Sequence, residues 1–363
     1  MIKQDLVAYV NIIRSCPESR KALVCPNFVI KNTMEILSRI IKKAQSNPKS
    51  IVLAEGDDIR IIEAAVRASK DKVANCILIG NRASIEQQAA DAGLSLQNLR
   101  IEDPTKSDRS AAYADNLFKI RAKKHLAHEQ AQQLVRDPLH FSDLMLQAGD
   151  VEGSIAGARY TTGDRVRTAL QIIGVAPGFT TVSSFFLMIF EAEHHEPKQA
   201  MIFSECALVI DPTAQQLAEI ALASTHSARQ LIDGEPRVAM LSFSTNGSAK
   251  HALVDKVREA TDLVRAQAPE LAIDGEIQLD AAIVPSVAAQ KYPNSQTGGN
   301  ANVLIFPDLN SANIGYKIAQ RLGGATAIGP IMQGLKKPAN DLSRGCSSDD
   351  VYYLIAMTVV QAQ

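Results

Sequence analysis

Short apolar runs alternate with longer amphipathic segments along most of the chain. The runs are continuous and rich in Val, Ile and Leu, which is typical of parallel strands buried on both faces. They predict strands at Ile51–Ala54, Cys76–Ile79, Ser154–Ala156, Met201–Phe203, Val238–Phe243, Ala281–Val284 and Asn302–Phe306. The helical period predicts helices at Thr33–Ala44, Ile59–Lys70, Ala214–Ala228, Ala252–Ala268, Asn313–Leu322 and Asp349–Gln361. The alternation of strand and helix indicates a three-layer α/β fold.

Residues 1–32 form an element set apart from this pattern. Asp5–Ile13 is expected to be a short helix that the steps Cys16-Pro17 and Cys25-Pro26 would end. The segment lacks the apolar core of a signal peptide. Proline, glycine, serine and threonine interrupt the most apolar stretch, Val175–Phe190, whereas a membrane span needs about 20 mostly apolar residues.

Length and charge narrow the class of protein. A chain of 363 residues predicts about two domains, since domains usually span roughly 100–200 residues. Lys and Arg number 38 and Asp and Glu 39, so we expect no broad basic face for nucleic acid. The five cysteines lack metal-type spacing and fit a reducing, cytoplasmic location. His194 and His195 sit in the polar segment Glu191–Lys198, which we interpret as a solvated loop rather than a metal site.

The most unusual polar passage runs from Gly334 to Asp350. It carries Lys336, Lys337, Ser343 and Arg344 and leads into a predicted helix. Amides at a helix start, a hydroxyl and a guanidinium together can hold a phosphate or an acyl oxygen. Ser347 and Asp350 also have the spacing of a capping box, so the spacing leaves capping and catalysis both open for Asp350. Cys346 near Arg344 could be a reactive thiol, although a small packed thiol is the simpler interpretation.

A second polar cluster follows the predicted strand at Ser154–Ala156. It combines small residues and Tyr160 with the hydroxyls of two threonines and three guanidiniums, from Thr161, Thr162, Arg159, Arg165 and Arg167. Such loops lie at the carboxyl ends of strands, where α/β sheets bind ligands, but solvated arginines would give the same pattern. The segments Gly298–Asn302 and Ser242–Lys250 are weaker candidates, because neither matches a Walker A loop or a dinucleotide-binding fingerprint.

Several long blocks of the sequence resemble the phosphate acetyl/butyryltransferase family, and within it the phosphate acetyltransferases (phosphotransacetylases). They include IVLAEGDDIRIIEAA, VSSFFLM, MLSFSTNGSAK, IDGEIQLDAAIVP, NVLIFPDLNSANIGYKIAQRL and GLKKPAND followed by SRGCSSDD. The resemblance implies two three-layer α/β domains like those of isocitrate/isopropylmalate dehydrogenases, with the active site in the interdomain cleft. It places the first domain at 1–175 plus 333–363, with the extra N-terminal element 1–45, and the second at 176–332. A homodimer is also implied.

The implied reaction is reversible transfer of acetyl between acetyl phosphate and coenzyme A, with inorganic phosphate as the other product. By resemblance, Asp350 is the catalytic base, Ser343 hydrogen-bonds the acyl phosphate, and Arg344 orients the acetyl group. The family's arginines for coenzyme A or phosphate fall on Arg121 and Arg167, and its phosphate-binding hydroxyls on Thr161 and Thr162. We expect no metal and no prosthetic group.

The chain departs from the family pattern at Tyr160, Thr168 and Asn300, and it adds Arg159 and Arg165. These changes are expected around the phosphate and acyl pocket. If the family site is present, Arg121, Arg159, Arg165, Arg167 and Arg344 would gather with Lys336 and Lys337 on one cationic cleft. Two alternatives stay open: a butyryltransferase-like enzyme that takes a longer acyl chain, and a non-catalytic module that senses acyl-CoA.

Overall fold

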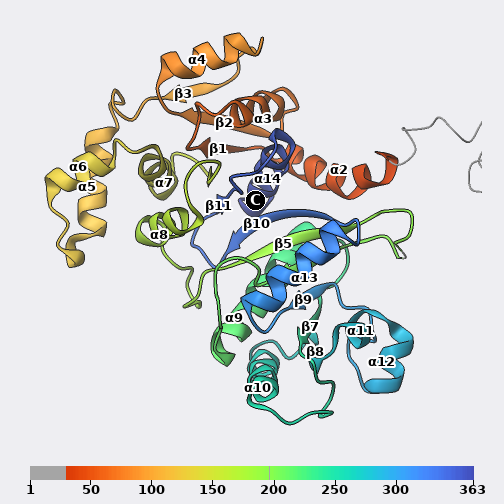
Figure 1. The fold of residues 1–363 in the computed structure, drawn as a ribbon. Helices are drawn as coiled ribbons and strands as arrows, with labels where there is room; N and C mark the ends of the chain where they lie inside the picture. The colour runs from red at the N-terminus through yellow and green to blue at the C-terminus, as the bar shows by residue number, and fades with distance from the viewer. Residues whose placement is uncertain (1–29, 196) are drawn as a thin grey trace, which may run out of the picture.

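The computed structural model describes residues 30–195 and 197–363, which form two β-sheets covered by helices (Figure 1). The predicted helix Asp5–Ile13 lies outside the described residues. The first helix, α2 (Ile30–Ser46), contains the predicted helix Thr33–Ala44. Two sheets with helices on both faces confirm the predicted α/β class.

The first sheet has five strands in the order β11-β4-β1-β2-β3, and all its neighbouring strands pair in parallel. The strands are β1 (Lys49–Leu53), β2 (Ala74–Ile79), β3 (Arg100–Glu102), β4 (Gly153–Ala156) and β11 (Ala339–Asp341). The helices of this half are α3 (Ile59–Lys70), α4 (Arg82–Asp91), α5 (Ser110–Ile120), the 3₁₀ turn η2 (Ala122–Lys124), α6 (His128–Leu134), α7 (Pro138–Ala148) and α8 (Thr162–Ile172).

Alternation along the strands explains the layers. Ile51 and Leu53 of β1 pack with α2, α3 and the C-terminal helix α14 (Ser348–Gln361), whereas Val52 between them packs with α5, α7 and α8. Successive side chains of a strand point to opposite faces, so a continuous apolar run supplies both interfaces. The predicted three-layer arrangement is therefore present.

The second sheet has six strands in the order β10-β5-β6-β9-β7-β8. They are β5 (Ser183–Phe190), β6 (Gln199–Ser204), β7 (Arg237–Leu241), β8 (Ala272–Ile277), β9 (Val303–Ile305) and β10 (Thr326–Gln333). The strands β6, β9, β7 and β8 are parallel, but β5 pairs antiparallel with both β6 and β10. Its helices are α9 (Ala214–Leu231), α10 (Ala252–Gln267), α11 (Leu279–Ile283), α12 (Pro285–Lys291) and α13 (Leu309–Arg321).

Helix α14 lies between the two sheets and joins their cores. Its residues Leu354 and Met357 belong to one continuous apolar cluster that includes Leu53 of the first sheet and Leu187 of the second. Helix α14 contacts α2, α3, β1, β10 and α9. The division of the chain at 175/176 and 332/333 stays a prediction, since this shared core spans both halves.

The prediction of a strand at Ala281–Val284 is wrong. Residues Leu279–Ile283 form α11, and Pro285 begins α12. The short apolar run is ambiguous between strand and buried helix, and here Ala281 and Ala282 bury a helical face while Pro285 cannot donate to a sheet ladder. The neighbouring strand β8 was missed because Asp274 and Glu276 interrupt its apolar pattern.

Candidate active site

Glu55 organises the carboxyl edge of the first sheet. It follows β1 and is buried, and its carboxylate accepts four backbone N–H groups, from Gly157, Ala158, Arg159 and Tyr160, at 2.6–2.9 Å. These residues form the loop that leaves β4. Several N–H donors stabilise a buried carboxylate in its charged form. Glu55 therefore fixes the start of the second polar cluster, and sequence spacing did not single it out.

Thr162 and Asp341 join this loop to the end of β11. The Thr162 hydroxyl donates to Asp341 Oδ2 at 2.7 Å, and Asp341 Oδ1 is buried without a partner. Burial raises the pKa of the Asp341 carboxyl to about 6, although the Thr162 hydrogen bond acts in the opposite direction. A Cβ on Gly157 would lie 2.3 Å from Asp341 Oδ1, so this close approach requires glycine.

Arg60 holds the loop that carries Ser343 and Arg344. From the first turn of α3, it donates to the carbonyls of Arg344 at 2.9 Å and Cys346 at 3.1 Å. Its other guanidinium nitrogen reaches Asp58 at 2.7 Å and the Ala158 carbonyl at 3.1 Å. One side chain thereby ties together the loops after β4 and β11. Sequence reasoning missed Arg60, although it lies inside one of the family-like blocks.

The start of α14 has the predicted capping box. Ser347 Oγ accepts from the Asp350 amide at 3.2 Å, while the Ser347 amide and hydroxyl both donate to Asp350 Oδ2 at 2.8 Å. The capping role of Asp350 is therefore confirmed. Both contacts reach the same carboxylate oxygen, and the side chain is exposed, so capping and proton transfer can coexist.

A cavity of about 420 Å³ places Ser343 and Asp350 opposite the second sheet. Its far wall includes Phe186 of β5 and Tyr316 of α13, whose rings stack with centroids 4.2 Å apart. Lys317 and Arg321 also line it, one turn apart on α13. Sequence reasoning missed these two cations. Their spacing of four residues indicates that they share one face of a helix, but it does not indicate which part of the protein that face contacts.

The prediction of one cationic cleft is wrong for Arg165. Its side chain is 0% exposed and pairs with the equally buried Asp143, with N–O distances of 2.7 and 2.8 Å. It also donates to the Asn340 carbonyl at 3.0 Å and to Ser154 Oγ at 3.0 Å. Arg165 therefore holds α7, α8, β4 and β11 together, and it faces no substrate space.

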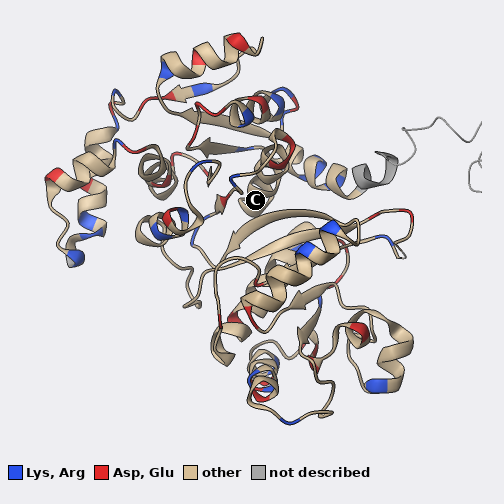
Figure 2. Cartoon of the chain, in the orientation of Figure 1, with Lys and Arg blue, Asp and Glu red and all other residues tan. Residues whose placement is uncertain are grey.

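The prediction is also wrong for Lys336 and Lys337. They line a separate cavity with Phe179 and His226, and Lys337 donates to the Leu146 carbonyl at 2.7 Å. The chain turns away after β10, so these lysines and Ser343 lie on different surfaces despite their closeness in sequence. Basic and acidic segments are interspersed over both halves (Figure 2).

The remaining predicted site residues, Thr161, Arg167, Arg121 and Arg159, do not line the cavity of Ser343 and Asp350. Thr161 caps α8, and its hydroxyl donates to Asp164 at 2.7 Å. Arg167 is exposed and pairs with the same Asp164 at 2.7 Å. Arg121 is the C-cap of α5, and its side chain makes no hydrogen bond or ion pair with the loop of Ser343 and Arg344. Arg159 pairs with Asp57.

The departures from the family pattern fall in different places. The Tyr160 hydroxyl donates to Asp137 at 2.5 Å, and burial raises the pKa of Tyr160. Thr168 is buried in α8. Asn300 precedes β9, at the amino end of that strand, and its carbonyl accepts from Arg237. Asn300 does not line the cavity of Ser343 and Asp350, and its place at the acyl pocket stays a prediction.

Cys346 is a packed thiol, as its simpler interpretation predicted. It is buried against the core, and this burial raises the pKa of the thiol, although the Arg60 guanidinium acts in the opposite direction. A raised pKa makes a thiolate nucleophile less available near neutral pH.

Within residues 30–195 and 197–363, no group of three or more His, Cys, Asp or Glu side chains could hold a metal ion. His194 and His195 both contact the Gly323 carbonyl, at 3.0 and 2.7 Å. Across the same residues, we find no helix with both the length and the apolar character that crossing a membrane demands.

Strand ends that meet at a cavity with an acid, a serine and several cations are typical of an α/β enzyme acting on anionic substrates. The chain belongs to the family described as Phosphate acetyl/butaryl transferase, whose model matches residues 35–359. The family membership that the sequence predicted is confirmed.

Individual relatives agree with this assignment. A phosphate acetyltransferase from Clostridium acetobutylicum is 46% identical over 330 residues, covering 91% of this chain and 99% of that protein. A phosphotransacetylase structure from Streptococcus pyogenes matches with a TM-score of 0.85 and 42% identity, covering 90% and 98% of the two chains. A Salmonella typhimurium structure provisionally described as a 4-hydroxythreonine-4-phosphate dehydrogenase, at 10% identity and a TM-score of 0.50, covers 86% and 100% and shares the fold alone.

Proposed function

We propose that this acyltransferase catalyses the reversible transfer of an acetyl group between acetyl phosphate and coenzyme A. The observation that carries the proposal is the convergence of Ser343 and Asp350 with Lys317 and Arg321 on one cavity. The relatives from Clostridium acetobutylicum, Acetivibrio thermocellus and Bacillus subtilis, 43–46% identical, are all named phosphate acetyltransferase.

Asp350 is the proposed general base. A free thiol has a pKa of about 8.5 and is mostly protonated at neutral pH, so attack requires a proton acceptor. Ser347 already holds Asp350 Oδ2, and we assign Oδ1 to accept the thiol proton. The sulfur then bonds to the acetyl carbon, the bond from that carbon to the phosphate oxygen breaks, and inorganic phosphate leaves with the electron pair.

The loop of Ser343 and Arg344 supplies the proposed electrostatic contacts. The Ser343 hydroxyl would donate to the acyl phosphate, and the Arg344 guanidinium would offset the charge that develops on the acyl oxygen. Arg60 donates to the Arg344 carbonyl, which makes Arg60 a positioning residue for this contact. The order of the loop therefore depends on a side chain from α3.

Several groups are proposed to hold the phosphates of the two substrates. Lys317 and Arg321 line the cavity itself, and Arg121 and Arg167 would bind coenzyme A or phosphate farther out. Thr161 and Thr162 each donate to a carboxylate in the substrate-free structure. Each hydroxyl has one proton, so donation to phosphate would require both to leave Asp164 and Asp341.

The activity is tested by measuring acetyl-CoA formation from acetyl phosphate and coenzyme A. We expect turnover that falls from acetyl to propionyl to butyryl phosphate. A best rate with butyryl phosphate would instead identify a butyryltransferase, since each methylene in an apolar pocket is worth about 1–3 kcal/mol. Acyl-CoA binding without any turnover would identify a sensing module.

We further propose that the reaction needs no metal or prosthetic group, because coenzyme A itself supplies the nucleophile. Activity should then persist after dialysis against EDTA. We also propose a cytoplasmic location. Among the described cysteines, Cys76, Cys206 and Cys346 are all free thiols, as is usual in a reducing compartment.

A homodimer is proposed on the exposed apolar side of α13. Ile314, Ile318 and Leu322 are 59, 52 and 84% exposed and follow one another at helical spacing. An apolar stripe of this kind is typical of an interaction surface. Light scattering should give twice the chain mass, and Ile318→Glu should shift the protein toward monomer. A monomeric wild type would contradict the proposal.

A further inference from the structure

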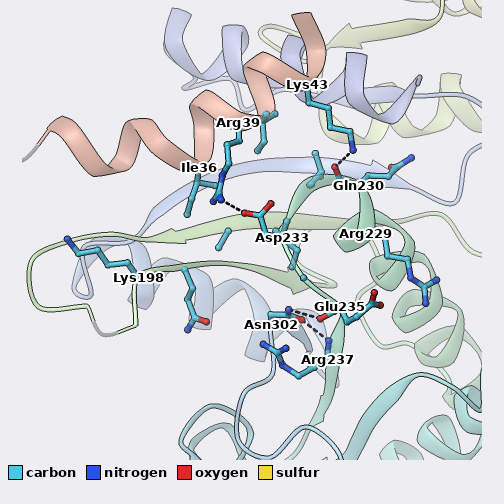
Figure 3. A pocket seen from close by; sticks show the side chains of 16 residues that line it. Ile36, Arg39, Lys43, Lys198, Arg229, Gln230, Asp233, Glu235, Arg237 and Asn302 are labelled. Carbon is cyan, nitrogen blue, oxygen red and sulfur yellow. Dashed lines mark hydrogen bonds and ion pairs between the residues drawn. The ribbon is translucent and has the colours of Figure 1, made fainter. Parts of the chain in front are cut away.

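A second cavity, of about 570 Å³, lies between α2 and the edge of the second sheet where β6 and β7 begin (Figure 3). It shares no residue with the cavity of Ser343 and Asp350. Its lining comes from α2, the end of α9, the turn that follows, and the starts of β6 and β7. The volume is within the usual range of small-molecule sites.

Basic side chains dominate the lining. Five of its residues are basic and two are acidic: Arg39, Lys43, Lys198, Arg229 and Arg237 against Asp233 and Glu235. The chain as a whole has a net charge of −1. The excess of positive charge is therefore a local property of this cavity, and it favours an anion.

Internal partners account for three of the five cations. Arg39 pairs with Asp233, Lys43 donates to the Gln230 carbonyl at 2.8 Å, and Arg237 donates to the Asn300 carbonyl at 2.5 Å. Lys198 and Arg229 are exposed and make no ion pair or side-chain hydrogen bond with residues 30–195 or 197–363. Their charged groups are thus available to a ligand.

Figure 3 shows how the cations surround the cavity. Arg39 and Lys43 descend from α2, Arg237 lies on the opposite side, and Lys198 and Arg229 stand at its two ends with their charged groups turned outward. A single small anion could reach few of these groups at once. A ligand that uses both ends must carry more than one anionic group.

The cavity also has an apolar part. Ile36 and Ile40 of α2 are buried there, with Ala200, Leu231 and Ile232 completing the lining. Ligand sites commonly combine an apolar surface with a few polar groups that orient the ligand. An uncharged ring or chain would cover these side chains while its anionic groups meet the cations.

We propose that this cavity binds a small phosphorylated metabolite, with two or more phosphate groups attached to an uncharged body of nucleotide type. Phosphates fit because Arg and Lys bind phosphate oxygens through charge-assisted hydrogen bonds. Arg229 and Lys198 are its contacts from the second sheet, and α2 supplies the opposite wall. A bound ligand would tie α2 to the second sheet and raise the melting temperature by mass action.

The test measures binding of ADP and of tripolyphosphate to the full chain by calorimetry, and compares the wild type with a double variant of this cavity. We expect the wild type to have one site that the double variant weakens, with an affinity that falls with added salt. The double variant Lys198→Gln/Arg229→Gln should bind the probes at least about tenfold more weakly, equivalent to about 1.4 kcal/mol. Its rate of acetyl-CoA formation in the absence of the probe should equal that of the wild type.

The matched control is Lys70→Gln/Arg136→Gln, which removes two exposed charges outside this cavity and should bind like the wild type. Equal weakening in the control would mean general charge attraction and would overturn the proposal. It would also be overturned if neither probe bound the wild type, or if the Lys198→Gln/Arg229→Gln variant bound both probes as tightly as the wild type.

Discussion

Asp349 and Asp350 are adjacent at the start of α14, yet their carboxylates have different partners. Asp349 pairs with Arg67 of α3 at 2.5 Å, whereas Asp350 is held by Ser347 and lines the cavity that Ser343 also lines. Successive residues of a helix point about 100° apart. Substituting each acid in turn therefore separates a specific role of Asp350 in the cavity from the general effect of a negative charge at the start of the helix.

Asp350→Asn should lower acetyl-CoA formation by about 10²–10⁴-fold, the usual contribution of a general base. The amide oxygen can still accept from Ser347, so the free energy of unfolding should change by less than about 1 kcal/mol. Steady-state kinetics and urea unfolding measure both effects. Asp349→Asn is the control and should keep nearly full activity; a similar loss in both variants would assign the effect to the helix terminus.

Arg60→Gln should release the loop of Ser343 and Arg344. The variant loses charge-assisted hydrogen bonds to the carbonyls of Ala158, Arg344 and Cys346. We expect kcat/KM to fall by about 100-fold, equivalent to about 2.7 kcal/mol. Arg67→Gln, on the same helix but paired with Asp349 at the surface, should stay within a fewfold of wild type. Full activity in Arg60→Gln would show that the loop is ordered without it.

Arg165→Met should destabilise the protein rather than alter substrate binding. It leaves the buried Asp143 carboxylate without its cation, which typically costs about 3–5 kcal/mol. Adding Asp143→Leu removes the orphaned charge, so the double variant should recover much of the loss in urea unfolding. Arg159→Gln, at an exposed ion pair, should change stability by at most about 1 kcal/mol. A stable Arg165→Met with a raised KM for acetyl phosphate would contradict the structural role.

Asp341 should make stability fall as the pH rises. Its pKa is about 6 in the folded protein against 3.8 for an ordinary carboxyl, so the folded state binds more protons between these values. Stability is then lost as pH rises from about 4 through 6, by at most about 3 kcal/mol. The free energy of unfolding of Asp341→Asn, relative to that of the wild type, should therefore increase by about 2–3 kcal/mol between pH 4 and pH 7.5, as measured by urea unfolding.

Thr162→Val tests the same carboxyl from the other side. The Thr162 hydrogen bond lowers the Asp341 pKa, so its removal should raise that pKa further and extend the loss of stability to higher pH. An unchanged pH profile in both variants would mean that Asp341 does not titrate in this range.

The sequence predicted best what depends on neighbouring residues. The capping box needs only Ser347 and Asp350, three positions apart, and the strands β1, β2 and β4 needed only short apolar runs. The family-like blocks predicted the class of enzyme, because they are long and collinear.

What the sequence could not indicate depends on distant partners. In the sequence alone, Arg165 is indistinguishable from a solvated arginine; only the structure shows that Asp143 lies beside it in the core. The strand Ala339–Asp341 is polar, and Asn340 can be buried because Thr358 and Gln361 accept from its amide at 2.8 and 2.7 Å. Lys317 and Arg321 lie on an ordinary amphipathic helix, and only the packing of the two sheets turns that face toward Ser343.

The position of β11 beside β4 has a consequence for how the enzyme is made. Thr162 and Asp341 are 179 residues apart in the chain, so β4 keeps an open edge throughout the synthesis of the second sheet. The loop of Ser343 and the start of α14 follow the whole second sheet in the chain. The cavity that Ser343 and Asp350 line therefore cannot assemble during synthesis until these residues have followed the second sheet out of the ribosome.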